Sequence, residues 1–458
     1  MLTADIKPDL SDCLFSDLDF SNGAVAAVSG GSDSTALLLL LKDHLDRIAP
    51  TARLLAVTVD HGLRPDSAAE ARLVARLCAM RGIAHRILAW SGDKPASGLP
   101  AAAREARYNL LAAAAGAEGI KLILTGHTAD DQAETVLMRQ AREDDGRGVA
   151  GMAPATLHDW RAWIVRPLLG TRRASLREML RRRDIGWVED PTNVDVRFER
   201  PRVRAALAEG EGERRIVEAL ARATQAAGER EDVGHRAALL IDALASTPVP
   251  GLVRLDRDFA AHEDGQAAIY ALRILLATVG GVSFLADEAR CAVLFSRLRS
   301  APLCATLSRT VIDARRTGIF LRRERRDLPA AAPPADNRLW DNRRRITLKD
   351  GPGDLVIAPL GSAAARRASL SEDIPPSLSR AALAAEPSLW VGGECLDFAG
   401  GNAGPKSVSI VPVVAPFARF LPSFDLEPAA AVAALVGAPP LPAVPFHGHD
   451  GGRGWAKA

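Results

Sequence analysis

The first two hundred residues alternate short apolar runs with longer amphipathic stretches, and this alternation limits the fold more than any other feature of the sequence. Strands are predicted at 25–28, 54–59, 84–88 and 122–125, and helices at 35–45, 67–80, 100–115 and 130–142. Repeated strand–helix–strand units predict an α/β fold with a doubly wound, mostly parallel sheet. Such sheets bind ligands at the carboxyl ends of their strands, so the chemistry is expected in the turns that follow the strands.

The rest of the chain is predicted to form two further modules after a catalytic domain over residues 1–205. Residues 206–327 are rich in alanine and read as a mainly helical domain, with a β-hairpin near its end. After a Pro/Ala-rich linker, strand-like pieces predict a small β-containing C-terminal module over 337–445. Residues 446–458 are predicted to be a flexible tail.

Charge, cysteine usage and hydropathy exclude several classes of protein. With 58 basic and 56 acidic residues, no overall charge draws the chain to nucleic acid or to a membrane. The 5 cysteines contain no CxxC pair, which disfavours a zinc ribbon or a disulfide framework and favours a reducing cytoplasm. The acidic start does not resemble an export signal, and prolines interrupt the longest uncharged run, so no membrane span is expected.

A Gly-rich loop after the first predicted strand is the clearest chemical signal. Residues 24–34 read AVAAVSGGSDS, a strand that ends in a loop and opens a helix. The backbone N–H groups of such a loop and the positive end of the helix suit a phosphate. The Walker pattern GxxxxGK[ST] is absent, so a lysine-clamped γ-phosphate is not expected. A plainer alternative is a Ser/Gly turn in which Asp33 or Ser34 caps the helix.

The SGGxDS loop resembles the PP-loop of the N-type ATP pyrophosphatases, which hold the leaving pyrophosphate while they adenylate a substrate. The resemblance implies that Asp33 binds the Mg²⁺ that neutralises this leaving group. It also implies that ATP is bound by Ser29, Gly30, Gly31, Ser32, Asp33 and Ser34. A GxGxxG string at 146–151 follows a predicted helix where a dinucleotide fingerprint follows a strand, and it is therefore not read as one.

Five further motifs narrow this class of enzymes. They are DHGLR at 60–64, AREARY at 103–108, TGHTADDQAET at 125–135, RPLL at 166–169 and WVEDPTN at 187–193. In this order and spacing, over roughly residues 20–205, they resemble the tRNA(Ile)-lysidine synthetase family. The chain lacks the cysteine that follows the initiator methionine in fused glutaminases and the CxxC of several tRNA thiolases. Ammonia channelling and sulfur transfer are therefore not expected.

This resemblance implies an ATP-dependent C–N ligase that forms AMP and pyrophosphate. The wobble cytidine of tRNA(Ile) with anticodon CAU would be adenylated on its C2 oxygen, and the ε-amine of free L-lysine would then displace AMP. The modified tRNA would read AUA. The implied cofactors are ATP, which is a substrate, and Mg²⁺.

The resemblance also assigns roles to individual side chains. Arg107 is expected to stabilise charge on the α-phosphate, because a guanidinium binds two phosphate oxygens at once. Asp131 and Glu134 lie three residues apart on one predicted helix, and His127 lies four residues before Asp131, so all three can face one pocket. We assign Asp131 and Glu134 to the lysine ammonium, with either as general base, and His127 to the nucleotide or to lysine. The simpler alternative is an acidic first turn that only stabilises its helix dipole.

Contacts to the tRNA are predicted from basic residues. The candidates are His61, Arg64, Arg172, Arg173 and Arg204. Residues 161–204 hold 12 arginines and no lysine against 6 acidic residues, a pattern that suits RNA phosphates but is also common on solvated helices. A second arginine-rich stretch, 315–326 with 343–345, is a further candidate surface. Two alternatives remain open: a PP-loop enzyme that adenylates another substrate, and an RNA-binding protein that keeps ATP as a structural ligand.

Overall fold

The computed structural model describes residues 14–63, 66–92, 94–95, 97–142, 146–189, 197, 199–300, 302–348, 354–367, 374–398 and 408–447. Contacts within the chain define two compact units. The first takes the described residues up to Arg230, together with Pro422–Phe424 and the segment that starts at Pro442. The second takes Glu231–Leu421 and Asp425–Leu441. The predicted boundaries 1–205, 206–327 and 337–445 are not tested by this division and stay a prediction.

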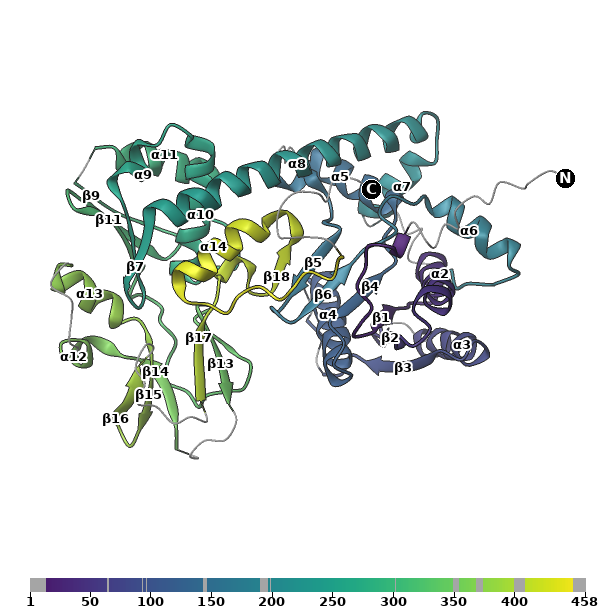
Figure 1. Cartoon of the computed structure of the whole chain (residues 1–458), viewed down its shortest axis with the longest axis horizontal. Coiled ribbons are helices and arrows are strands. Elements are labelled where there is room, and N and C mark those ends of the chain that lie inside the picture. Colours follow the sequence, from purple (N-terminus) through teal and green to yellow (C-terminus); the bar gives the residue numbers. More distant parts are fainter. Residues whose placement is uncertain are drawn as a thin grey trace. The chain divides into compact units, whose positions relative to one another are not determined.

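The first unit is an α/β domain (Figure 1). Its elements are β1 (Ala24–Ala27), α2 (Ser32–Ile48), β2 (Leu54–Asp60), α3 (Ser67–Met80), β3 (Ala84–Ala89), α4 (Leu99–Ala117), β4 (Leu122–Thr125), α5 (Ala129–Gln140), η1 (Arg147–Ala150), β5 (Ala155–His158), β6 (Ala162–Val165), α6 (Arg173–Arg182), α7 (Glu199–Leu207) and the start of α8 (Gly212–Leu244). Every strand and helix predicted before residue 142 is present, whereas β5 and β6 were not predicted.

The sheet of this unit has the order β18-β5-β6-β4-β1-β2-β3, where β18 is Phe420–Pro422. The pairs β1–β2, β2–β3, β1–β4 and β4–β6 are parallel, and β5 is antiparallel to β6. This confirms the predicted doubly wound, mostly parallel sheet. The chain runs outward from β1 to β3 and then returns to β4 on the other side of β1. The strand order therefore reverses between β1 and β4, which is where such folds bind ligands.

Helices cover both faces of this sheet. Right-handed crossovers put α2 and α3 on one face and α4 on the other, as Figure 1 shows. The five leucines Leu37–Leu41 of α2 are all buried, because α2 packs on the sheet and also against α6. A helix that is covered on more than one side reads as a continuous apolar run, as this one does.

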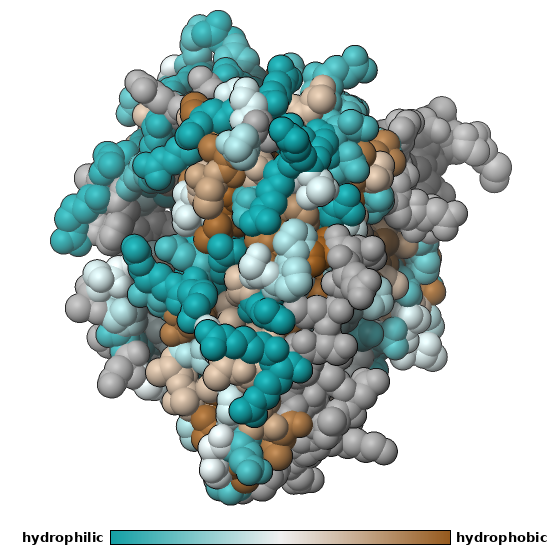
Figure 2. All heavy atoms as spheres, turned by 90° about the vertical axis from the view of Figure 1, so that its left-hand side faces the viewer, coloured by the Kyte–Doolittle hydropathy of each residue, from teal (hydrophilic) through white to brown (hydrophobic). Residues whose placement is uncertain are grey.

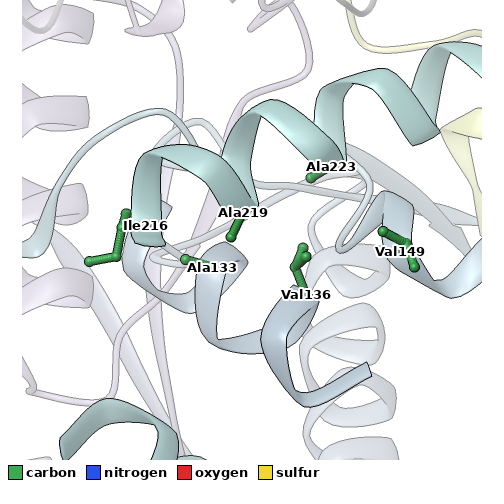
Figure 3. Close-up of a cluster of buried hydrophobic side chains, with 6 residues drawn as sticks. All are labelled: Ala133, Val136, Val149, Ile216, Ala219 and Ala223. Atoms are coloured by element: carbon green, nitrogen blue, oxygen red, sulfur yellow. The ribbon is translucent and has the colours of Figure 1, made fainter. Parts of the chain in front are cut away.

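The first part of α8 packs against helix α5. Small side chains of α8 face α5 and η1, which lets the helices approach closely (Figure 3). This cluster consists of Ala133, Val136, Val149, Ile216, Ala219 and Ala223, and each is at most 4% exposed.

The segment from Pro442 returns to the first unit and pairs with its beginning. The indole of Trp163 donates to the carbonyl of Ala443 at 2.9 Å. Asp19 N donates to the carbonyl of Pro445 at 3.0 Å, and His447 N donates to the carbonyl of Asp17 at 2.8 Å. Of the predicted tail, residues 446 and 447 thus take part in backbone pairing, and residues 448–458 lie outside the described residues.

The second unit combines helices with antiparallel sheets. Its helices are the end of α8, α9 (Arg257–Ala261), α10 (Gly265–Gly280), α11 (Glu288–Leu298), α12 (Gly361–Ala365), α13 (Pro376–Leu383), η3 (Ala415–Phe417) and α14 (Leu426–Val436), while η4 (Ser423–Asp425) lies at the boundary. Its strands are β7 (Ala245–Val249), β8 (Leu252–Leu255), β9 (Leu303–Leu307), β10 (Thr310–Arg315), β11 (Gly318–Arg323), β12 (Leu339–Trp340), β13 (Arg344–Leu348), β14 (Val356–Pro359), β15 (Pro387–Val391), β16 (Glu394–Phe398) and β17 (Val408–Pro412).

These strands form three sheets, with the orders β7-β8-β11-β10-β9, β12-β13-β17 and β14-β15-β16. The predicted hairpin is part of the first of them. The apolar helix α10 packs against β10 and β11 of that sheet. Most of its residues are buried, which explains its uniformly apolar sequence.

A buried ionic network stabilises the second unit. Asp341 accepts hydrogen bonds from Arg309 at 2.7 Å, Arg323 at 3.0 Å and Arg343 at 2.8 Å. Glu386, which is fully buried, pairs with Arg343 and Arg344. Buried carboxylates and guanidinium groups are tolerated only when they satisfy one another in this way. Three arginines of the second predicted RNA-binding stretch, Arg323, Arg343 and Arg344, are therefore structural.

The surface in Figure 2 mixes hydrophilic side chains with smaller hydrophobic areas. Within the part of the chain that the structure describes, no helix combines the length and the apolar character needed to cross a membrane.

Candidate active site

The Gly-rich loop between β1 and α2 begins the site. Gly30 has a φ of +89°, and an added Cβ would lie 3.2 Å from Val74 and 3.4 Å from Val188, so glycine is required there. The hydroxyl of Ser34 accepts a hydrogen bond from Ser29 N at 3.1 Å and so folds the loop onto the helix. In the first turn of a helix the N–H groups have no partner within the helix, and they are the donors that bind phosphate.

Two later segments cover this loop. Val188 N donates to the carbonyl of Gly30 at 2.8 Å, so the chain after α6 runs along the loop. Arg177 of α6 donates from Nε to the hydroxyl of Ser32 at 3.3 Å. Sequence reasoning counted Arg177 only as part of the arginine-rich stretch 161–204, yet it places a guanidinium beside the predicted phosphate site. The end of the WVEDPTN motif, residues 190–193, lies outside the described residues.

The turn after β4 fixes the direction of Asp131. Thr128 caps α5: its N–H donates to Asp131 Oδ2 at 2.9 Å, and Asp131 N donates to Thr128 Oγ1 at 3.4 Å. This capping box occupies Oδ2 of Asp131 and leaves Oδ1 for a contact outside α5. Glu134 lies one turn further along α5 and is 1% exposed.

Gly126 brings this turn against the Gly-rich loop. A Cβ at Gly126 would lie 2.9 Å from the backbone of Asp33 and 2.9 Å from the backbone N of Ser34, closer than any side chain can approach. The glycine therefore permits contact between the end of β4 and the start of α2. As a result, the two predicted parts of the site adjoin each other.

Arg173, the first residue of α6, connects the three carboxylates. Its Nε donates to Asp33 Oδ2 at 2.8 Å and its Nη2 to Asp131 Oδ1 at 2.9 Å. Its Nη1 lies 3.5 Å from Glu134 Oε1. The structure thus gathers Asp33, Asp131 and Glu134 around one guanidinium. Burial alone would lower the pKa of Arg173, but the charges of Asp131 and Asp33 outweigh it and raise this pKa above its ordinary value.

Helix α7 brings two more arginines to Glu134. Arg204 binds it with two nitrogens, Nε at 2.7 Å and Nη2 at 3.1 Å. Arg200 lies one turn earlier, with Nε 3.6 Å from Glu134 and Nη2 at 3.1 Å from the hydroxyl of Thr135. Sequence reasoning counted Arg200 only as part of the arginine-rich stretch 161–204, although its spacing of four residues from Arg204 places both on one helix face.

Four arginines, Arg104, Arg107, Arg166 and Arg200, which we call the arginine cluster, act electrostatically on His127. Burial first and then these four charges hold the pKa of His127 well below its ordinary value, so its imidazole is neutral. Its Nδ1 lies 3.0 Å from the hydroxyl of Thr125. The Nε atoms of Arg107 and Arg166 are buried and meet no hydrogen-bond partner among the described residues. Buried donors of this kind suit an anion.

Tyr108 is buried in the same cluster. The guanidinium carbons of Arg104 and Arg107 lie 5.1 and 5.3 Å from the centroid of its ring. Burial would raise the pKa of Tyr108, but the charges of Arg104, Arg166 and Arg107 overcome this effect and lower the pKa to about 8. The cluster therefore creates a positive potential that is strong enough to shift a buried phenol.

His61 lies at the end of β2, and its ring meets that of Trp90 edge to face at 6.0 Å. Burial and the charge of Arg107 lower its pKa, while Asp60 acts in the opposite direction. Arg107 thus acts on both His61, which follows β2, and His127, which follows β4. Arg64 lies outside the described residues. Arg172 pairs with Asp130 at 3.2 Å and with an exposed glutamate of α8.

The doubly wound sheet with an SGGSDS loop at its switch point defines a PP-loop domain. Consistent with this, residues 9–211 match the family model described as PP-loop domain. The tRNA(Ile)-lysidine synthase of Mesorhizobium japonicum is 64% identical over 452 residues, which cover 97% of this chain and 99% of the relative. The tRNA(Ile)-lysidine synthase of Brucella ovis is 38% identical over 433 residues, with 91% and 95% covered. The chain belongs to the tRNA(Ile)-lysidine synthase family, which confirms the resemblance seen in the sequence.

Among solved structures, the U34-tRNA thiolase NcsA from Methanococcus maripaludis is similar over 47% of this chain and 77% of its own, with 17% identity and a TM-score of 0.40.

Proposed function

We propose that this chain is an ATP-dependent ligase that joins free lysine to C2 of the wobble cytidine of tRNA(Ile) with anticodon CAU. The observation that carries the proposal is the meeting of Asp33 from the PP-loop with Asp131 and Glu134 from α5 around one guanidinium. A leaving-group site and a cation pocket that adjoin each other are what a two-step adenylation and amine transfer needs. The high identity to lysidine synthases over nearly the whole chain supports the same reaction.

In the first step, the C2 oxygen of the cytidine attacks the α-phosphorus of ATP, and pyrophosphate leaves. The N–H groups of the PP-loop, with the hydroxyls of Ser32 and Ser34, would hold the pyrophosphate. Arg107 would bind the α-phosphate, because its Nε is buried without a partner among the described residues. His127, held neutral by its surroundings, would donate or accept one hydrogen bond to the nucleotide.

Asp33 fits a Mg²⁺ ion. Magnesium is usually held by one or two carboxylates together with substrate phosphates, so a single aspartate beside a phosphate loop is a suitable donor set. Bound there, Mg²⁺ would neutralise charge on the leaving pyrophosphate.

In the second step, the ε-amine of lysine forms a bond to C2, the bond from C2 to the AMP oxygen breaks, and AMP leaves. Asp131 Oδ1 and Glu134 would bind the ε-ammonium, and one of them would take its proton before attack. Arg204 would orient Glu134 and lie close to the substrates. We assign His61, Arg64 and Arg172 to the side on which tRNA approaches, and place the reaction in the cytoplasm. Arg173, which the sequence grouped with them, contacts Asp33, Asp131 and Glu134.

An in vitro ligation tests this function. The full-length protein is incubated with ATP, Mg²⁺, labelled lysine and an unmodified tRNA(Ile) transcript with anticodon CAU, and the digested tRNA is examined by mass spectrometry. Lysine on the wobble cytidine is expected. Pyrophosphate release with other substrates, but no lysidine, would favour a different adenylating PP-loop enzyme, and neither product would favour an RNA-binding protein.

The variants Asp33→Ala and Glu134→Gln together separate the adenylation step from the lysine-transfer step. We expect Asp33→Ala to lose adenylation by at least a hundredfold, since the leaving group loses its charge compensation. Glu134→Gln should still form adenylated tRNA but need much more lysine. Adenylation at the wild-type rate in Asp33→Ala would contradict the assignment of the PP-loop.

A further inference from the structure

The guanidinium of Arg173 occupies the position that the proposed function gives to the substrate ammonium. Its Nη2 lies 2.9 Å from Asp131 Oδ1, the oxygen that the capping box leaves available. Its Nη1 lies 3.5 Å from Glu134 Oε1. Two cations cannot both bind the same two carboxylate oxygens closely. The ammonium of lysine and the guanidinium of Arg173 therefore compete for Asp131 and Glu134.

This position of Arg173 is built into the fold. Its backbone N donates to Asp130 Oδ2 at 2.7 Å, and Ala129 N donates to the carbonyl of Thr171 at 3.0 Å. One backbone hydrogen bond and one bond to the Asp130 side chain thus attach the start of α6 to the start of α5. The side chain of Arg173 is 15% exposed, which means that water screens its ion pairs only weakly.

Without a cation, the gathered carboxylates would repel one another. Asp33, Asp131 and Glu134 therefore all attract whichever cation lies between them. Arg204 compensates part of this charge from the other side of Glu134. Arg173 is the group that contacts all three.

We propose that Arg173 is the resting counter-ion of the lysine pocket and that the ε-ammonium of lysine displaces it on binding. This inference rests on the proposed function. Arg173 is then a specificity-determining residue. An amino acid with an uncharged side chain cannot replace the guanidinium at the carboxylates, so Arg173 stays bound to them. The need to displace Arg173 weakens the binding of lysine, but it also prevents the binding of uncharged amino acids.

Calorimetric titration tests the exchange. L-lysine is titrated into the full-length protein with the tRNA transcript and a non-hydrolysable ATP analogue. Arg173→Gln should bind lysine roughly tenfold more tightly than the unsubstituted protein, because no internal cation competes. Arg173→Lys keeps a cation with fewer donors and should lie between the two. The control is Arg86→Gln, which removes an exposed ion pair with Glu118 and should leave the affinity unchanged.

A second measurement remains usable if Arg173→Gln does not fold. In Arg173→Ala, added guanidinium ion should fill the vacated place and weaken lysine binding, while the unsubstituted protein should respond little. Lysine affinity that is equal or weaker in every folded Arg173 variant, with no effect of guanidinium, overturns the inference. If the unsubstituted protein binds lysine and forms lysidine, that result leaves the proposed function intact, whereas no lysine binding by it overturns both.

Discussion

Tyr108 shows what the arginine cluster does at the scale of one residue. A buried phenol normally resists ionisation, yet three guanidinium groups lower the pKa of Tyr108 to about 8. Burial, together with the same charges, keeps the pKa of His127 well below its ordinary value, so that its imidazole is neutral. A site that favours a phenolate and disfavours an imidazolium is prepared for negative charge, such as that of the α-phosphate during adenylation.

We expect this shift to be visible by spectrophotometric titration, since the chain has only 2 tyrosines. One phenolate should form near pH 8 in the unsubstituted protein and be missing in Tyr108→Phe. The pKa in the folded protein lies below the ordinary value near 10, so Tyr108 adds stability that develops as pH rises above about 8 and is absent below it. A single transition of both tyrosines near pH 10 would contradict the structure.

Individual residues also show which parts of the site could be predicted from the sequence. The motifs identified Asp33, Asp131 and Glu134, and the structure brings them together; their catalytic roles stay predictions. The sequence left open whether Asp131 only stabilises the dipole of its helix or serves the site; in the structure its Oδ2 belongs to the capping box of α5 and its Oδ1 contacts Arg173. The place of Arg173 was out of reach, because its partners are 39 to 140 residues away and local patterns carry no such contact.

At the scale of elements, α5 has two faces with different tasks. One face presents Asp131 and Glu134 to the site, while Ala133 and Val136 on the other pack against α8 (Figure 3). Helix α8 runs unbroken through Gly212–Leu244 although it contains Gly228 and Gly234. Glycine weakens a helix, but packing of its apolar face can outweigh that cost.

Val136→Ala should therefore affect stability and the site together. Removing two buried methyl groups is expected to cost about 1–3 kcal/mol and to raise the KM for lysine, because α5 loses part of its support. Thermal unfolding and steady-state kinetics measure the two effects. Val217→Ala on α8, at a position 58% exposed, is the matched control and should change neither. Equal stability of both variants would show that this packing does not hold α5.

At the scale of the whole molecule, the first unit is made from separated parts of the chain. Residues 14–230 build most of it, and the segment 442–447 supplies hydrogen bonds to Asp17, Asp19 and Trp163. Composition and periodicity predicted the sheet but not this return, because three hydrogen bonds between distant segments leave no periodic pattern. The antiparallel strands β7 and β8 escaped prediction for a similar reason, since each is short.

Truncation tests whether the segment 442–447 stabilises the first unit. A chain that stops after Leu441 loses these three hydrogen bonds, each worth about 0.5–1.5 kcal/mol, and its first unit should unfold at a lower temperature. A chain that stops after His447 keeps them and should melt like the full chain. If both truncated chains melt alike, the returning segment contributes nothing to stability.

The return of residues 442–447 also bears on how the protein is made. A ribosome releases the catalytic strands early, but the last contacts of that unit can form only after the whole second unit has been synthesised. A chain cut short by a premature stop or by damaged messenger RNA would carry a complete PP-loop in a unit that is never closed. Its lower stability would raise the fraction of unfolded chains, which are the ones that proteases attack.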